Sequence, residues 1–239
     1  MTHANQSYEL QVLVHGKPVT VYPHEDKSFI WGETGTEFAL KVWNNTGRRV
    51  EAVITVDGLS VMNGNPGSYD IGGYAVPPCS AVEIPGWRLD QKKIAQFFFA
   101  QFEKSYAALM GMPQNVGVIG CAIFNEAPRV SVLHPTTDLF RYRAPPALHS
   151  YGDSGLGLTR GGGSGIGTGF GQERGHAVTT VEFIRADVAK PDMLLAIHYG
   201  TKTQLALWRV PLKQPLQVAG ANPFPGEAVG CPPPPNWRG

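Results

Sequence analysis

Charge is the property that this sequence has least of. Asp, Glu, Lys and Arg together make up 16% of its 239 residues, against roughly 25% in an average soluble domain. The net charge is only +1, and Lys and Arg are scattered along the chain rather than gathered into a basic stripe. A nucleic-acid backbone requires such a stripe, so the composition argues against a nucleic-acid partner. A surface with so little charge is instead typical of one that protein partners cover.

The sequence also lacks the segments that mark membrane proteins and secreted proteins. It contains no apolar run of about 18 residues, so we expect no membrane span. Residues 1–9 are polar and lack the apolar stretch of a signal peptide. The three cysteines, Cys79, Cys121 and Cys231, are far apart and show no zinc-type or CxxC spacing. We therefore expect reduced thiols and synthesis in a cytoplasm-like compartment.

Motifs for catalysis and for nucleotide binding are missing as well. The glycine-rich stretch 161–171 (GGGSGIGTGFG) has no Gly-Lys-Ser/Thr ending and no G-x-G-x-x-G register. No G-x-S-x-G or HExxH motif occurs. Acidic residues lie near predicted turns at Glu25, Asp26, Asp57, Asp70 and Asp90. Two of them could converge as a glycosidase-like pair, although such a pair can be drawn in almost any set of β-sandwich loops. The stretch 57–70 lacks the dense D-x-D-x-D spacing of a calcium loop. We therefore expect no catalytic residue, no cofactor and no metal.

Glycine and proline are abundant, and they indicate an all-β chain with many turns. The sequence contains 29 Gly and 20 Pro, which favours short strands over helices. Residues 8–14 alternate apolar with mostly polar positions, and a return strand over 19–22 predicts a hairpin. Residues 37–43 and 50–56 alternate more clearly, and the turn residues 44–47 between them predict a second hairpin. The faces expected to be buried carry Phe38, Leu40 and Val42 on one strand, and Val50, Ala52, Ile54 and Val56 on the other.

Further strands complete the predicted β-sandwich over residues 1–127. Three consecutive phenylalanines favour a strand rather than a helix at 94–102. Residues 116–124 read as a central strand, where Gly117 and Gly120 would allow another sheet to approach closely. A strand at 80–84, a mainly irregular stretch at 57–78 and a helical turn at 105–110 are also expected. A jelly roll and an immunoglobulin-like sandwich both fit this pattern.

The rest of the chain predicts extended arms and a small β extension. Residues 128–175 are rich in Gly and Pro and are expected to form a linker or an arm. Residues 176–212 are expected to form a short β extension packed on the sandwich, with strands at 177–184, 193–199 and 203–210. Residues 213–239 form a Pro-rich tail, whose four consecutive prolines predict a polyproline II rod.

Aromatic side chains in or beside loops and tails are the candidate interface residues. Such residues are enriched in interface hot spots and in sugar-binding platforms, and ordinary core packing is the alternative for about half of them. The candidates are Trp31, Tyr69, Tyr74, Trp87, Phe170, Trp208, Phe224 and Trp237.

Three motifs resemble a family of bacterial and phage-associated β proteins to which no chemistry is assigned. They are 56–59 (VDGL), 69–74 (YDIGGY) and 115–120 (NVGVIG). The resemblance extends over about residues 8–125 and includes the PPPPNWRG end at 232–239. It implies a β-sandwich of bacterial or phage origin and assigns no catalytic residue.

Together these features predict a non-enzymatic structural subunit of a larger assembly. A virion component, such as a capsid decoration, connector or tail protein, is the concrete form, with copies of the chain as partners. In this hypothesis 128–175 and 211–239 reach onto neighbouring subunits. The alternative is a carbohydrate- or protein-binding β-sandwich module that uses the loop aromatics. An enzyme is the third hypothesis, and it would require perturbed acids or histidines gathered in one pocket.

Overall fold

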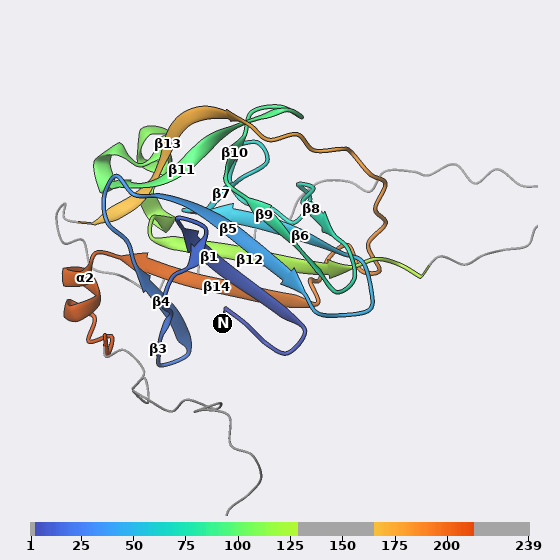
Figure 1. Cartoon of the computed structure of the whole chain (residues 1–239), viewed down its shortest axis with the longest axis horizontal. Helices are drawn as coiled ribbons and strands as arrows, with labels where there is room; N and C mark the ends of the chain where they lie inside the picture. The colour runs from blue at the N-terminus through green and yellow to red at the C-terminus, as the bar shows by residue number, and fades with distance from the viewer. Residues whose placement is uncertain (1–2, 129–164, 213–239) are drawn as a thin grey trace, which may run out of the picture.

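Two β-sheets lie face to face in the computed structural model, which describes residues 3–128 and 165–212 (Figure 1). Strands make up 48% of these residues and helices 9%. The prediction of a mostly β chain is therefore confirmed, and the two-sheet arrangement fits a β-sandwich. No helix within the described ranges has the length and apolar character needed to cross a membrane.

The first sheet is organised around β5. Strand β1 pairs along one edge of β5, while β9 and β11 pair with successive parts of its other edge. Strand β10 also pairs with β11, and β13 pairs along the free side of β11. The members are β1 (Tyr8–Val14), β2 (Lys17–Pro18), β5 (Glu37–Asn44), β9 (Ser80–Ile84), β10 (Gly86–Arg88), β11 (Lys93–Gln101) and β13 (Ile166–Gly175).

The second sheet has β12 and β14 at its centre. Strand β12 lies between β6 and β14 and is antiparallel to both, while β14 is parallel to β4. Short strands complete the sheet beside β4 and β6. The members are β3 (Tyr22–His24), β4 (Lys27–Trp31), β6 (Val50–Val56), β7 (Leu59–Ser60), β8 (Tyr74–Val76), β12 (Val118–Asn125) and β14 (Met193–Gly200).

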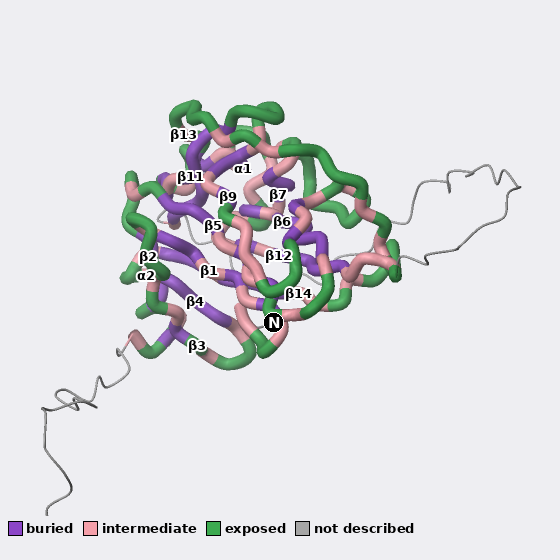
Figure 2. The backbone as a smooth tube through the Cα atoms, turned by 45° about the vertical axis from the view of Figure 1, so that its right-hand side comes forward, coloured by how far each residue is buried: buried purple, intermediate pink, exposed green. Residues whose placement is uncertain are grey.

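A single large apolar core fills the space between the sheets. Leu10 and Leu40 of the first sheet and Ile54, Ile119 and Ile197 of the second are at most 1% exposed. Figure 2 shows the buried residues along the strands and the exposed residues in the connections. The alternating positions predicted for 37–43 and 50–56 are indeed buried, and Ala39, Glu51 and Val53 on the opposite faces are buried as well. Burial of such side chains is worth roughly 1.5–3 kcal/mol each, which is why the apolar face of every central strand points inward.

The predicted hairpin of 37–43 with 50–56 is wrong, although both strands exist. Strand β5 belongs to the first sheet and β6 to the second. The connection between them is held by the buried Asn44, whose Nδ2 donates to the carbonyls of Arg48 (2.7 Å) and Pro77 (2.9 Å). Alternation determines which face of a strand is buried, but two strands that bury matching faces can equally well face each other across a core.

The hairpin predicted after 8–14 forms, with an earlier return strand than expected. His15 and Gly16 occupy the turn with φ of 51° and 72°, and β2 then pairs Lys17 with Val14. Residues 19–21, where the strand was predicted, are not in a strand.

Two apolar segments that the sequence assigned to strands, 94–102 and 116–124, are confirmed as β11 and β12. The reason given for Gly120 is wrong, since a Cβ there would lie 2.8 Å from Thr55 Oγ1 of β6 in the same sheet. The predicted helical turn is α1 (Tyr106–Leu109), and Ser105 Oγ caps it by accepting from Ala108 N. The 3₁₀ turns η1 (Phe102–Lys104) and η2 (Pro113–Asn115) flank this helix.

The end of the predicted 128–175 arm is instead a regular strand, β13. Its glycines are required by close contacts, because a Cβ at Gly169 would lie 2.2 Å from the Phe98 ring. A Cβ at Gly167 would likewise lie 2.4 Å from Ser105 Cβ. Glycine here permits tight cross-strand packing rather than flexibility. The remainder of the predicted arm, 129–164, and the tail 213–239 lie outside the described residues.

The predicted β extension over 176–212 is also corrected. Segment 193–199 does form a strand, β14, but that strand lies inside the second sheet. Segment 203–210 contains a helix, α2 (Lys202–Leu207), because Thr201 and Gln204 form a capping box at its start and Leu205 is fully buried. Residues 177–184 form no strand.

Candidate functional site

Two of the candidate interface aromatics are core residues. Trp87 is 2% exposed, and its indole N–H donates to the carbonyl of Gly169 at 3.0 Å. Tyr74 is 7% exposed, and its hydroxyl accepts from Arg88 Nη2 at 3.0 Å. Neither side chain is available to a partner of the folded chain.

The other described candidates are accessible but lie apart. Trp31, Tyr69 and Phe170 are 37%, 39% and 43% exposed, while Trp208 is half-buried against Phe29. Trp31 ends β4, Tyr69 lies in the loop before β8, and Phe170 lies in β13. No ring contact joins any two of these described candidates. Phe224 and Trp237 lie outside the described residues.

The most distinctive surface feature is the extended segment 176–192, which we call the strap. It leaves β13 of the first sheet and crosses to β14 of the second along the side of the molecule (Figure 1). Its first amides donate to the turn before β11, and later ones donate to β12. These donor and acceptor pairs are His176 N to Lys92 O, Val178 N to Gln91 O, Ala186 N to Asn125 O and Asp192 N to Ile123 O.

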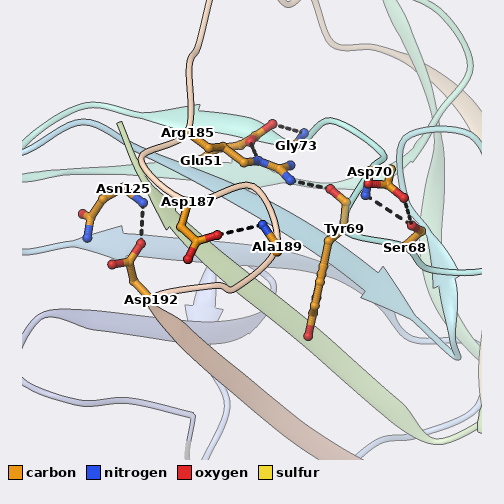
Figure 3. A network of polar contacts seen from close by, with 10 residues as sticks. All are labelled: Glu51, Ser68, Tyr69, Asp70, Gly73, Asn125, Arg185, Asp187, Ala189 and Asp192. Carbon is orange, nitrogen blue, oxygen red and sulfur yellow. Dashed lines mark hydrogen bonds and ion pairs between the residues drawn. The ribbon is translucent and has the colours of Figure 1, made fainter. Parts of the chain in front are cut away.

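Arg185 anchors the middle of the strap to the outer face of the second sheet (Figure 3). Its Nε donates to Glu51 Oε2 at 2.6 Å, and its Nη1 donates to the carbonyl of Tyr69. The other oxygen of Glu51 accepts from the Gly73 amide at 2.7 Å. The side chains of Arg185 and Glu51 are each only 11% exposed. One nearly buried ion pair thus joins the strap, the loop before β8 and strand β6.

The strap and this loop cover a small second core on the outer face of the sheet. Phe124, Val53 and Ala122 form this cluster, and Phe124 is fully buried. The Arg185 guanidinium lies 3.9 Å from the centre of the Phe124 ring, a cation–π contact. The Tyr69 ring meets the same ring edge-on, with centroids 5.6 Å apart. The outer face is therefore covered here by a third layer of chain.

Arg49 forms a second anchor for the strap. Its guanidinium pairs with the carboxylate of Glu126 through two donors and donates to the carbonyl of Glu182 at 2.8 Å. It also lies 5.3 Å from the centre of the Phe183 ring. Arg49 lies directly before β6, and Glu126 lies directly after β12. Their ion pair therefore attaches the strap to both strands.

The anchored strap holds apolar side chains out into solvent. Val181, Ile184 and Val188 are 49%, 63% and 65% exposed. Tyr69, whose carbonyl accepts from Arg185, is 39% exposed. Within the described chain, the amides of residues 179–183 donate no backbone hydrogen bond. We call the side chains of Tyr69, Val181, Ile184 and Val188 the strap surface.

A buried carboxylate, Asp57, ties the two sheets together. It is 1% exposed and occupies the turn after β6 with φ of 54°. Its Oδ1 accepts from the Gly117 amide (2.8 Å) and the Tyr199 hydroxyl (2.5 Å), and its Oδ2 accepts from the Thr168 amide (2.7 Å). Thr168 Oγ1 lies 2.8 Å from the Tyr199 hydroxyl. Thr168 belongs to the first sheet and the other partners to the second sheet or its connections.

Burial raises the pKa of Asp57 to about 6, and the hydrogen bonds from Tyr199, Thr168 and Gly117 act in the opposite direction. Burial and the nearby Asp57 carboxylate also raise the pKa of Tyr199 well above its usual value. A perturbed acid beside a tyrosine hydroxyl resembles catalytic machinery. At 1% exposure, however, Asp57 does not meet solvent, so this geometry serves structure.

The acidic residues considered as a calcium site do not converge. Asp57 is occupied as described, while Asp70 accepts from Ser68 Oγ in an exposed turn. No group of three or more potential metal ligands occurs among the described residues.

Sequence reasoning missed Glu51 and Arg185, which organise the outer layer, and it named Asp57 only as an acidic residue near a turn. Only the Asp57-Gly58 turn dipeptide carried a local signal. Arg185 and Glu51 are 134 residues apart, and no pattern in the sequence pairs them. No protein-family model, curated protein or solved structure matches this chain at a significant level.

Proposed function

We propose that this protein is a non-enzymatic structural subunit of a larger assembly, and that the strap surface contacts neighbouring copies of the chain. The observation that carries the proposal is an apolar surface held in a fixed position. Ile184 and Val188 are more than 60% exposed, yet the adjoining Arg185 is nearly buried in an ion pair. The strap therefore cannot turn these side chains inward without breaking that pair.

Association would remove this apolar surface from water. Each square ångström of apolar surface buried is worth roughly 25 cal/mol. In addition, the amides of 179–183 are available to donate hydrogen bonds to a strand of a neighbouring chain, as in β-augmentation. Thr, Val and Phe, which dominate this stretch, are residues that favour strands. Both effects favour a protein partner over solvent.

A virion component, such as a capsid decoration, connector or tail protein, is the concrete form of this proposal. The low charge of the sequence and its resemblance to phage-associated β proteins support it. A jelly roll or an immunoglobulin-like sandwich, the finer fold class, belongs to the same proposal. Synthesis in a reducing compartment is supported by Cys79 and Cys121, which form no disulfide among the residues that the structure describes, and burial raises the pKa of Cys121 to about 12.

The mass of the full-length chain in solution, measured by light scattering over a range of concentrations, tests the proposal. We expect wild type to form species larger than one chain. The double variant Ile184→Ser with Val188→Ser should shift the distribution to single chains, because it removes apolar area from the strap surface.

A matched control removes equally exposed leucines elsewhere. Leu109 and Leu207 are 70% and 75% exposed and lie in α1 and α2, so the double change to Ser should leave assembly intact. Both variants should unfold at temperatures near that of wild type. A wild-type chain that stays single at every concentration, or a strap variant that assembles normally, would contradict the proposal.

A further inference from the structure

A groove opens beside Trp31, at the end of the second sheet opposite to the strap. Its volume is about 270 Å³, and it lies between the β1–β2 hairpin and the loop 32–36. Trp31 pairs with Gly200 at the end of β14, whereas the strap joins the other end of that strand. A ligand in this groove would not contact the strap surface.

The rim of the groove is held rigidly by backbone hydrogen bonds. The Gly35 amide donates to the Phe99 carbonyl at 2.6 Å, and the Phe99 amide donates to the Thr36 carbonyl at 3.0 Å. The Gly32 amide donates to Gly200 at 3.0 Å. The loop 32–36 is thus fixed to both sheets, so binding would require little ordering of the protein.

The floor of the groove is aromatic, and its shape depends on a glycine. The Phe99 ring lies beneath Gly32, and a Cβ at Gly32 would lie 2.8 Å from this ring. The exposed Trp31 forms a wall of the same groove. Apolar surface of this kind suits the C–H face of a ring-shaped ligand.

The polar groups of the groove are free to bind a ligand. Within the described chain, the Trp31 indole N–H, the Glu33 carboxylate and the hydroxyls of Thr20 and Thr36 form no protein hydrogen bond or ion pair. They provide both donors and acceptors beside the aromatic surface. This mixture of ring stacking and hydrogen bonding is what a polyhydroxylated ligand requires.

The charge of the lining restricts the ligand further. Among the described residues that line the groove, Glu33 carries a charge and none is a Lys, Arg or His. An anionic ligand, such as a phosphate or a sialylated or sulfated glycan, would therefore meet a like charge and no cation. A quaternary ammonium group is usually held in a cage of several aromatic faces, whereas this groove presents Trp31 and the nearly buried Phe99.

We propose that this groove binds a neutral saccharide unit, with the sugar face on Trp31 and a sugar hydroxyl donating to Glu33. The volume lies just below the roughly 300–1,000 Å³ of pockets for drug-sized ligands, so one part of a longer glycan occupies it. This activity is independent of assembly through the strap surface.

A glycan array probed with the labelled full-length chain tests the proposal. The array should hold neutral oligomers of glucose, galactose, mannose and N-acetylglucosamine beside sialylated and sulfated glycans. We expect binding to a neutral series. The affinity for the best neutral oligomer should then be measured by calorimetric titration. We expect Trp31→Ala to weaken this affinity at least about tenfold and Glu33→Gln to reduce it as well.

Phe170→Ala is the matched control, since Phe170 is 43% exposed, Trp31 is 37% exposed, and Phe170 lies in neither the groove nor the strap surface. It should leave glycan affinity unchanged, and Trp31→Ala should leave the assembled mass unchanged. Three results would overturn the proposal: no binding to any neutral glycan, preference for the anionic glycans, or equal affinity of wild type and Trp31→Ala.

Discussion

Strand β6 has a buried carboxylate at each end, and the two are stabilised in different ways. Glu51, near its start, pairs with the Arg185 guanidinium and accepts from the Gly73 amide. Asp57, directly after its end, accepts from two amides and a tyrosine hydroxyl. No cation pairs with Asp57 among the residues of known position. One buried charge is compensated by an opposite charge and the other by neutral donors alone.

The two surroundings also differ in what covers the carboxylate. Glu51 lies beneath the strap, which is a single extended segment. If the strap lifts, water reaches the Glu51 carboxylate. Asp57 lies in the core between the sheets, where only unfolding exposes it. The cost of burying its charge is therefore larger, which is why its pKa is raised to about 6. We infer that Glu51 holds the strap docked on the second sheet, whereas Asp57 contributes to the global stability of the fold.

The largest effect is expected for Asp57→Ala. This change leaves the Gly117 amide, the Thr168 amide and the Tyr199 hydroxyl without their acceptor, and it places alanine at φ of 54°. The free energy of unfolding should fall by about 4 kcal/mol or more. Chemical denaturation with two independent probes would measure it.

Asp70→Ala is the control for this prediction, because Asp70 is exposed in a turn and accepts from Ser68. Its effect should stay below about 1 kcal/mol. Equal effects of the two changes would show that Asp57 does not tie the sheets together.

A smaller and local effect is expected for Arg185→Ala. The change leaves Glu51 buried without a cation, and the strap should lift so that water reaches the carboxylate. The loss of unfolding free energy should be about 2 kcal/mol, less than for a pair broken inside a core. Hydrogen exchange should become faster in the strap and in the loop before β8, and stay slow in β12 and β14.

The control is Arg174→Ala, because Arg174 also pairs with a glutamate, Glu37, but both side chains are about half exposed. It should cost less than about 1 kcal/mol and should not change exchange in the strap. Uniformly faster exchange in Arg185→Ala would mean that the strap does not dock as a separate unit.

The smallest effect is the pH dependence that Asp57 confers. Its pKa is about 6 in the folded chain and 3.8 in its ordinary state, so the folded state binds more protons between these values. Stability from this group therefore rises as the pH falls from 7 to 5, by about 1 kcal/mol. Asp57→Asn, which tolerates the same backbone conformation, should lack this contribution.

The measurement is the difference in unfolding free energy between wild type and Asp57→Asn at pH 5, 6 and 7. His3, His176 and His198, whose pKa values are lowered mainly by burial, affect both proteins equally and cancel. A difference that does not change with pH would indicate that Asp57 has an ordinary pKa in the folded chain.

Sequence patterns were reliable where near neighbours decide the structure. The alternation of 50–56 identified the face of β6 that points into the central core, and the phenylalanines of 94–102 identified a strand buried on both sides. The same reasoning failed at 203–210, where the capping box of Thr201 and Gln204 made a helix from a segment with strand-like alternation. It failed again at Trp87, because an aromatic near a predicted turn can equally fill the core.

By itself, the sequence determined that the chain is mostly β, which faces of its central strands are buried, and where α1 begins. Each of these depends on side chains a few residues apart. Tertiary structure alone decided that β5 and β6 belong to different sheets, that glycines 167 and 169 lie in a strand, and that Arg185 meets Glu51. Those outcomes depend on which distant surfaces come together to exclude water, and hydrophobic burial is non-directional, so no local pattern specifies them.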